Sequence, residues 1–145
     1  MSELYQEQKR QLTYAGAAVA IEAAVAKSRE IGAPECIAIV DAGSNLLGFA
    51  RVEGAAVIAR DPAIAKASTA AALAMATGGI PFEFGVNLGE SSNGAISNLS
   101  GGLPIILDGV VLGAIGVGSG TPDQDVIVAE AGRDAVLAAL QRSEA

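Results

Sequence analysis

Lys66 is the residue whose surroundings point most directly to chemistry. It is the sole charged residue in an otherwise small and apolar segment, AIAKASTAAALAMA, and Thr69 follows it about one helical turn later. A lysine buried near carboxylates can form a Schiff base, transfer a proton or hold an acidic substrate. The alternative is a stem that lies on alanine methyl groups with its ammonium group in water. The sequence therefore offers Lys66 as a catalytic candidate and Thr69 as a ligand contact beside it.

Three further charged residues stand at the ends of two predicted strands. Asp41 ends the first strand, and Arg51 and Glu53 end the second. Functional side chains often occupy strand ends and the loops that follow them. We expect either salt bridges at the rim of the sheet or a charge cluster with Lys66 around a small pocket. In the pocket arrangement Arg51 holds a carboxylate. The groups that exchange protons are then Lys66, Glu53 and Asp41.

A glycine-rich segment, Gly116–Thr121, precedes the last predicted helix and resembles a phosphate-binding loop. It contains no lysine of the P-loop type, and Asp123 and Asp125 in the first helical turn would repel an added anion. We expect a tight strand-to-helix connection instead of a nucleotide site. Ser119 and Thr121 remain candidates to contact a small carboxylate ligand at its edge.

The composition excludes several functional classes. The 145 residues contain no His and one Cys, so a Ser-His-Asp triad, His ligation of a metal and an internal disulfide are excluded. Nine Lys+Arg against sixteen Asp+Glu give a formal net charge of −7, which disfavours nucleic acid and membrane surfaces as partners. The chain shows neither a bilayer-length apolar segment nor a signal peptide. We expect a cytoplasmic protein that binds no metal.

Helical periodicity and capping signals predict three helices that would carry these residues. The first is expected over about residues 8–31, where Gly32 ends it, and the second over 61–77, with Asp61 as its N-cap. The third begins after Thr121, because Thr121 and Gln124 form a capping box around Pro122.

Strand signals predict two hairpins and a long connection. Strands are expected over Cys36–Val40, with both faces covered, and over Leu46–Val52. Asp108-Gly109 between two apolar runs predicts a hairpin over 103–117. Residues 78–102 are expected to form a loop, and a short strand over 95–99 is the alternative.

The order of these elements is typical of a single α+β domain over residues 1–145, in which helices flank an antiparallel sheet. Three helices in so short a chain leave an apolar sheet face or an alanine-rich helix face uncovered. We therefore expect a homo-oligomer, in which another copy of the chain covers that face.

Three segments resemble the GlcG/HbpS-like family, whose members are described as haem-degrading or haem-binding domains and also form the C-terminal domain of PduO-type proteins. They are GGLPIILDGVVLGAIGVGSGTPDQDVIVAEAG, IAIVDAGSNLLGFARVEGA and DPAIAKASTAA. The resemblance implies an antiparallel sheet of about five strands between helices, similar to profilin or PAS domains, and oligomers as large as octamers. On motif agreement, it carries site roles to Asp41, Arg51, Lys66, Thr69 and the pair Gly101 and Gly102.

The resemblance leaves three functions open. The first is binding or conversion of a small organic acid, similar to muconate from aromatic catabolism, by a cofactor-independent hydrolase or isomerase. The second is a haem carrier or sensor. Haem-binding relatives use His, which this chain lacks, so haem would bind through Met1, Cys36, Met75 or a Tyr, or through hydrophobic contacts alone. The third is an oligomeric scaffold without a ligand. The first function requires no cofactor.

Overall fold

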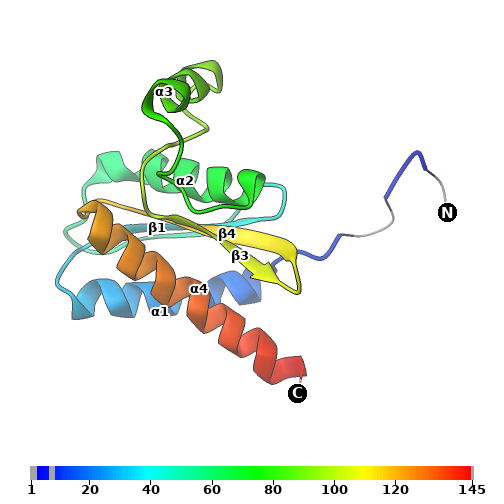
Figure 1. Ribbon diagram of the computed structural model, residues 1–145. Coiled ribbons are helices and arrows are strands. Elements are labelled where there is room, and N and C mark those ends of the chain that lie inside the picture. Colours follow the sequence, from blue (N-terminus) through cyan, green and yellow to red (C-terminus); the bar gives the residue numbers. More distant parts are fainter. Residues whose placement is uncertain (1–2, 7–8, 145) are drawn as a thin grey trace.

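The computed structural model describes residues 3–6 and 9–144, and these residues contain a four-stranded antiparallel sheet. The strands β1 (Cys36–Asp41), β2 (Leu46–Arg51), β3 (Gly102–Leu107) and β4 (Val110–Gly118) lie in the order β2-β1-β4-β3. Helices α1 (Tyr14–Glu30) and α4 (Pro122–Glu144) cover one face, and the short 3-10 helix η1 (Val57–Ala59) leads into α2 (Arg60–Leu73) on the other (Figure 1). The α+β class is confirmed, but the expected count of about five strands is wrong, because residues 95–99 form no strand.

The central strand β1 separates two hydrophobic cores. All six of its residues are buried. Ile37 and Ile39 join the larger core with α1 and α4, whereas Cys36, Ala38 and Val40 join the core beneath α2. Successive side chains of a strand point to opposite faces, so one strand contributes to both cores. The prediction that both faces of this strand are covered is confirmed.

Two local motifs form as their sequences predict. Asp108 and Gly109 connect β3 to β4 with backbone φ angles of 52° and 76°, which is the left-handed geometry of a tight hairpin turn. At the start of α4, Gln124 N donates to Thr121 Oγ1 over 3.2 Å, and Thr121 N donates to Gln124 Oε1 over 3.0 Å. This reciprocal pair is the predicted capping box.

Two helices are shorter than predicted. α1 begins at Tyr14, because Thr13 caps it by accepting a 3.2 Å hydrogen bond from Gly16 N. Residues 9–13 are not helical, and the expected start at residue 8 lies outside the described residues. α2 ends at Leu73, where Ala74 turns left-handed with φ 54°, so the predicted extension to residue 77 is wrong. None of the described helices is both long and apolar enough to cross a membrane.

Small residues let α2 approach the sheet closely. A Cβ on Gly116 of β4 would contact Ala63 O and Ala67 N and would lie 3.0 Å from Ala67 Cβ. A Cβ on Gly102 of β3 would lie 2.9 Å from the carbonyl carbon of Lys66. The backbones of helix and strands are therefore in contact where those side chains are absent. The Lys66 backbone thus lies against β3, and its ammonium group reaches the end of β4.

The region predicted as a loop contains a further helix, α3 (Phe82–Ser91), which lies beyond α2 on the side away from the sheet (Figure 1). Its start is held by Asn98, whose Oδ1 accepts from Ile80 N over 3.0 Å and whose Nδ2 donates to Ile80 O over 2.7 Å. Within α3, Gly85 is the buried residue, and Phe82 and Phe84 are 80% and 60% exposed. The helix therefore presents an aromatic surface instead of joining a core.

Candidate functional site

Lys66 of α2 forms a buried ion pair with Asp125 of α4. Its Nζ donates to Asp125 Oδ2 over 3.0 Å and to Val117 O at the end of β4 over 2.7 Å. The side chains of Lys66 and Asp125 are only 5% and 6% exposed. Of the two arrangements left open for Lys66 in the sequence, the structure therefore shows the buried lysine beside a carboxylate.

Asp125 connects this ion pair to the glycine-rich turn. Its second oxygen, Oδ1, accepts a 3.0 Å hydrogen bond from Gly120 N. Asp125 also lies in the first turn of α4, where the partial positive charge of the helix N-terminus stabilises a carboxylate. The segment that resembled a phosphate-binding loop thus binds a carboxylate of the chain itself.

Glu35, just before β1, is a third charged group in this cluster, and the sequence did not identify it. The residue is 0% exposed, and neither of its carboxyl oxygens receives a hydrogen bond from a described residue. A Cβ on Gly120 would lie 3.0 Å from both the Glu35 carboxyl carbon and Asp125 Oδ1, so the two carboxyl groups meet at this glycine. Burial and then the negative charge of Asp125 raise the pKa of Glu35 to about 8, against smaller opposite effects of Gly120 N–H and Lys66.

A cavity of about 370 Å³ opens beside the ion pair. It lies between η1, the start of α2 and the connection from β4 to α4. Its lining residues include both members of the ion pair and the polar turn that follows β4; they are Ile58, Ala59, Pro62, Lys66, Leu99, Ser100, Gly118, Ser119, Gly120, Pro122 and Asp125. Ser119 Oγ accepts a 2.9 Å hydrogen bond from Ala56 N, which leaves its hydroxyl proton available to a ligand.

The three charged residues predicted at strand ends do not line this cavity. Asp41 shapes the β1–β2 turn, because its Oδ1 accepts from Gly43 N and from Asn45 N, each over 2.9 Å. Arg51 is exposed on the edge strand β2. The Glu53 side chain is 86% exposed and pairs with Arg29 over 3.3 Å. Hydrogen bonds from its own backbone and from Arg29 lower the Glu53 pKa.

The remaining predicted contacts surround Lys66 more closely. A Cβ on Gly101 would lie 3.2 Å from Lys66 Nζ, so this glycine leaves room for the ammonium group. Thr69 is buried; its Oγ1 donates to Ala65 O over 2.7 Å and accepts from Ser97 N over 2.9 Å. Thr121 is occupied in the α4 capping box. Ser119 is thus the predicted ligand contact that lines the cavity with a free donor.

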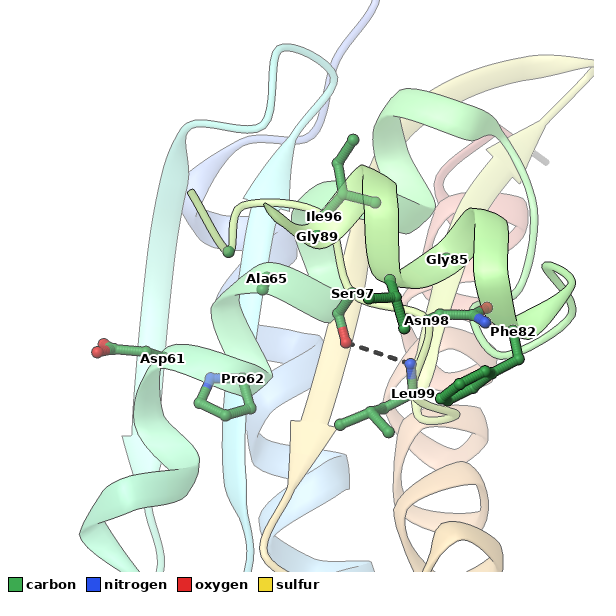
Figure 2. A pocket seen from close by; sticks show the side chains of 12 residues that line it. Asp61, Pro62, Ala65, Phe82, Gly85, Gly89, Ile96, Ser97, Asn98 and Leu99 are labelled. Carbon is green, nitrogen blue, oxygen red and sulfur yellow. Dashed lines mark hydrogen bonds between the residues drawn. The ribbon is translucent and has the colours of Figure 1, made fainter. Parts of the chain in front are cut away.

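A second cavity of about 480 Å³ lies between α2, α3 and residues 94–99 (Figure 2). Its walls are mostly apolar, and within residues 94–99 Leu99 N donates to Ser97 Oγ over 3.2 Å (Figure 2). It shares Pro62 and Leu99 with the first cavity, so the two hollows adjoin. Asp61 at its rim pairs with Arg60, which lowers the pKa of Asp61.

The residues of these two cavities do not supply a ligand for haem iron. No described residue lining either cavity is a His, Cys, Met or Tyr. Cys36 is buried in the core beneath α2, where its Sγ lies 3.6 Å from Ala56 O and burial raises its pKa. Met75 is exposed and lines neither cavity, and Met1 lies outside the described residues. Nor do three potential metal-binding side chains gather anywhere in the described chain.

Comparisons with known proteins agree on one family. A 15.0 kDa protein from the dhaT-dhaS intergenic region of Citrobacter freundii is 37% identical over 128 residues, covering 85% of this chain and 90% of that protein. The crystal structure of ORFY from Klebsiella pneumoniae matches with a TM-score of 0.85 and 29% identity, covering 95% and 97% of the two chains. The structure of a PduOC–haem complex matches with a TM-score of 0.79 and 25% identity, covering 86% and 94%.

The family match covers the elements that build the cluster, from the segment before α1 to the middle of α4. Residues 12–134 match the family described as haem degrading protein HbpS-like. The chain therefore belongs to the HbpS-like family.

Proposed function

We propose that the chain binds a small organic acid in the cavity beside Lys66. The observation that supports this function is the buried Lys66–Asp125 ion pair at the wall of a 370 Å³ cavity. Removing two charges from water is costly, and apolar residues of similar volume would stabilise a purely structural core equally well. A charged pair that is buried yet borders a hollow is therefore better explained by a ligand.

The available donors suit an acceptor oxygen such as that of a carboxylate. The Lys66 ammonium group has three protons, and two of them are used by Val117 and Asp125. The third proton and the free hydroxyl proton of Ser119 are left to bind the acid. The cavity is of the size that small-molecule sites have, and its remaining walls, such as Ile58 and Leu99, are apolar. An unsaturated dicarboxylate of the muconate type matches this combination.

Conversion of the bound acid would use the groups that border the cavity. Lys66 and Asp125 are in a position to exchange protons with a ligand, whereas Glu53, Asp41 and Arg51 are outside the cavity and have no part in the proposal. A hydrolase or isomerase of this kind needs no cofactor. Incubation of cis,cis-muconate with the protein, followed by chromatography, separates binding from turnover.

Calorimetric titration with a panel of muconate-like acids tests the binding. We expect saturable binding by wild type, at least a tenfold loss of affinity in Lys66→Met, and unchanged affinity in Arg51→Ala, because Arg51 does not line the cavity. Circular dichroism confirms that each variant is folded. Equal affinity of wild type and Lys66→Met, or a larger loss in Arg51→Ala than in Lys66→Met, contradicts the proposal.

Haem binding is a second candidate, favoured by the apolar cavity between α2 and α3 and by the haem complex of the similar PduOC. Because no described lining residue is a His, Cys, Met or Tyr, the binding would rest on apolar contacts with side chains such as Phe82, Val86 and Leu99. We then expect haem and metal-free protoporphyrin to bind with affinities that agree within about threefold, as measured by absorbance titration. A haem affinity more than tenfold higher would reveal an iron ligand and contradict this explanation.

We also propose that the chain forms a homo-oligomer through α3. The exposed side chains of Phe82, Phe84 and Val86 place an apolar surface on a helix that contacts the sheet of its own chain little. A second copy that covers this surface would bury the aromatic rings. Light scattering should therefore give a multiple of 14.4 kDa for wild type and a smaller mass for Phe82→Ser/Phe84→Ser. A monomeric wild type at micromolar concentration would contradict the proposal.

A further inference from the structure

We propose that Glu35 is a positioning residue that must hold its proton for the Lys66 cavity to bind an acid. The inference rests on the proposed function of the cavity. Glu35 does not line the cavity itself, so it acts through Asp125, which does. The expected ligand is an ionised carboxylic acid. It binds while the cluster of Lys66, Asp125 and Glu35 carries no net charge.

Glu35 is fixed in a position from which its carboxyl group can reach Asp125. Its backbone oxygen accepts a 3.0 Å hydrogen bond from Val52 N, which holds the start of β1 against the end of β2. Its side chain is fully buried and meets Asp125 at Gly120, where the absence of a Cβ gives both carboxyl groups room. Asp125 Oδ1 and Oδ2 already accept from Gly120 N and Lys66 Nζ.

The unpaired oxygens of Glu35 identify which carboxyl group carries the proton. An ionised Glu35 would place a second buried negative charge beside Asp125, which is a costly state that the nearby Gly120 N–H and Lys66 offset only in part. A protonated Glu35 instead has one O–H that can donate to Asp125. Asp125 has the compensating charge of Lys66 and the donor of Gly120, so it is the group that stays ionised.

The net charge of the cluster depends on whether Glu35 holds its proton, because the charges of the surrounding groups are fixed. Lys66 faces it from α2, Asp125 from α4, and the Cys36 thiol follows it on β1. Burial keeps this thiol neutral by raising its pKa, and Arg51, opposite Cys36 on β2, is exposed to solvent. The cluster is therefore neutral with the Glu35 proton and carries one negative charge without it. A carboxylate ligand is repelled only in the second state.

Calorimetric titration with cis,cis-muconate between pH 6.5 and pH 9.5 tests this coupling. Muconate is fully ionised over this range, so its own charge does not change. If muconate binds only while Glu35 holds its proton, and the pKa of Glu35 is about 8, the apparent affinity of wild type for muconate should fall about 30-fold from pH 6.5 to pH 9.5. Glu35→Gln cannot lose a proton, and its affinity should vary less than about threefold. Glu130→Gln, an exposed change on α4, should follow wild type.

A measurement on the unmodified protein keeps the inference testable if Glu35→Gln does not fold. The side-chain carboxyl ¹³C resonance of Glu35, followed by NMR against pH, should titrate well above the ordinary range of a glutamate. Titration between pH 4 and pH 5 overturns the inference. Identical pH profiles of wild type and Glu35→Gln overturn the coupling but leave the proposed function standing. Absence of muconate binding at every pH refutes the proposed function and, with it, the coupling.

Discussion

The Lys66–Asp125 ion pair makes a quantitative prediction about stability. Lys66→Met removes the ammonium group while it retains most of the apolar stem, so packing of this side chain between α2 and its neighbours β4 and α4 changes little. Asp125 is then left as a buried carboxylate without a cation beside it, and it keeps only neutral donors such as Gly120 N. The variant therefore tests the cost of one unpaired charge at this position.

The magnitude follows from the distance and burial of the pair. At 3.0 Å and an effective dielectric constant of about 20, the attraction is on the order of 5 kcal/mol. Breaking a buried pair by removal of one partner costs about 3–5 kcal/mol in proteins. We expect Lys66→Met to lower the free energy of unfolding by about that amount. Lys27→Met is a matched control, because Lys27 and Glu30 form a 2.8 Å pair with side chains 33% and 67% exposed. Loss of an exposed pair of this kind should cost less than about 1 kcal/mol.

Because of Glu35, the loss of Lys66 and the loss of Asp125 should have unequal effects on stability. In Asp125→Asn, the lysine loses its partner, but Glu35 can release its proton and supply a negative charge nearby. In Lys66→Met, no other described cation takes part in the cluster. We therefore expect Asp125→Asn to destabilise less than Lys66→Met does. The double variant should be about 1–3 kcal/mol more stable than the sum of the two single effects predicts.

Urea unfolding at pH 7, followed by circular dichroism, measures wild type and these four variants on one scale. If Lys66→Met lowers the free energy of unfolding by less than about 1 kcal/mol, the ammonium group is hydrated in solution. The buried ion pair on which the proposed site depends would then be refuted. Strict additivity of the two substitutions would likewise show that Lys66 and Asp125 do not interact.

Two further predictions concern the backbone contact and the buried acid. Gly116→Ala should destabilise the protein by about 1–3 kcal/mol in urea unfolding, because its Cβ would contact Ala63 O and Ala67 N of α2. Gly79→Ala, which meets nothing within 4 Å, should change stability by less than about 0.5 kcal/mol, and equal effects of the two would refute the close approach. The pKa of Glu35 is about 8 in the folded chain against an ordinary value of 4.5, so the folded state holds a proton that the unfolded state releases. Stability should therefore fall as pH rises from about 4.5 to 8, by at most about 1.4 kcal/mol per pH unit, and Glu35→Gln should flatten this slope. Parallel pH–stability curves for wild type and Glu35→Gln would contradict it.

The elements that the sequence predicts well are those fixed by local chemistry. The Asp108-Gly109 turn and the Thr121–Gln124 capping box each depend on residues within four positions of one another. Their conformations follow from allowed φ angles and from adjacent donors and acceptors. Helix α3 is different, because Gly85 and Gly89 weaken its helical signal. Its start is held by two hydrogen bonds between Asn98 and Ile80. Asn98 lies beyond the end of the helix, so the residues of the helix itself do not indicate this contact.

The candidate site shows the same division between local and long-range information. Lys66 stands out because a lone charge in an alanine-rich segment is conspicuous in the amino-acid sequence itself. Arg51 and Glu53 are equally polar, but the end of an edge strand exposes them to solvent, and strand order does not follow from local pattern. Glu35 is the opposite case. Beside Pro34 it resembles an exposed loop residue, whereas in the fold its buried carboxyl group lies against Gly120, a residue far along the chain.

Glycine placement explains how so small a domain can hold three charged groups together. A Cβ would lie 3.2 Å from Lys66 Nζ at Gly101 and 3.7 Å from it at Gly118, and at Gly120 it would contact Glu35 Oε1. Side chains at these positions would fill the space in which the ammonium and carboxyl groups meet. Gly101 also has φ 122°, a conformation that other residues rarely adopt. In the sequence, these glycines resemble a phosphate-binding loop. In the structure, the absence of their side chains leaves room for the chain's own charged groups and for the cavity beside them.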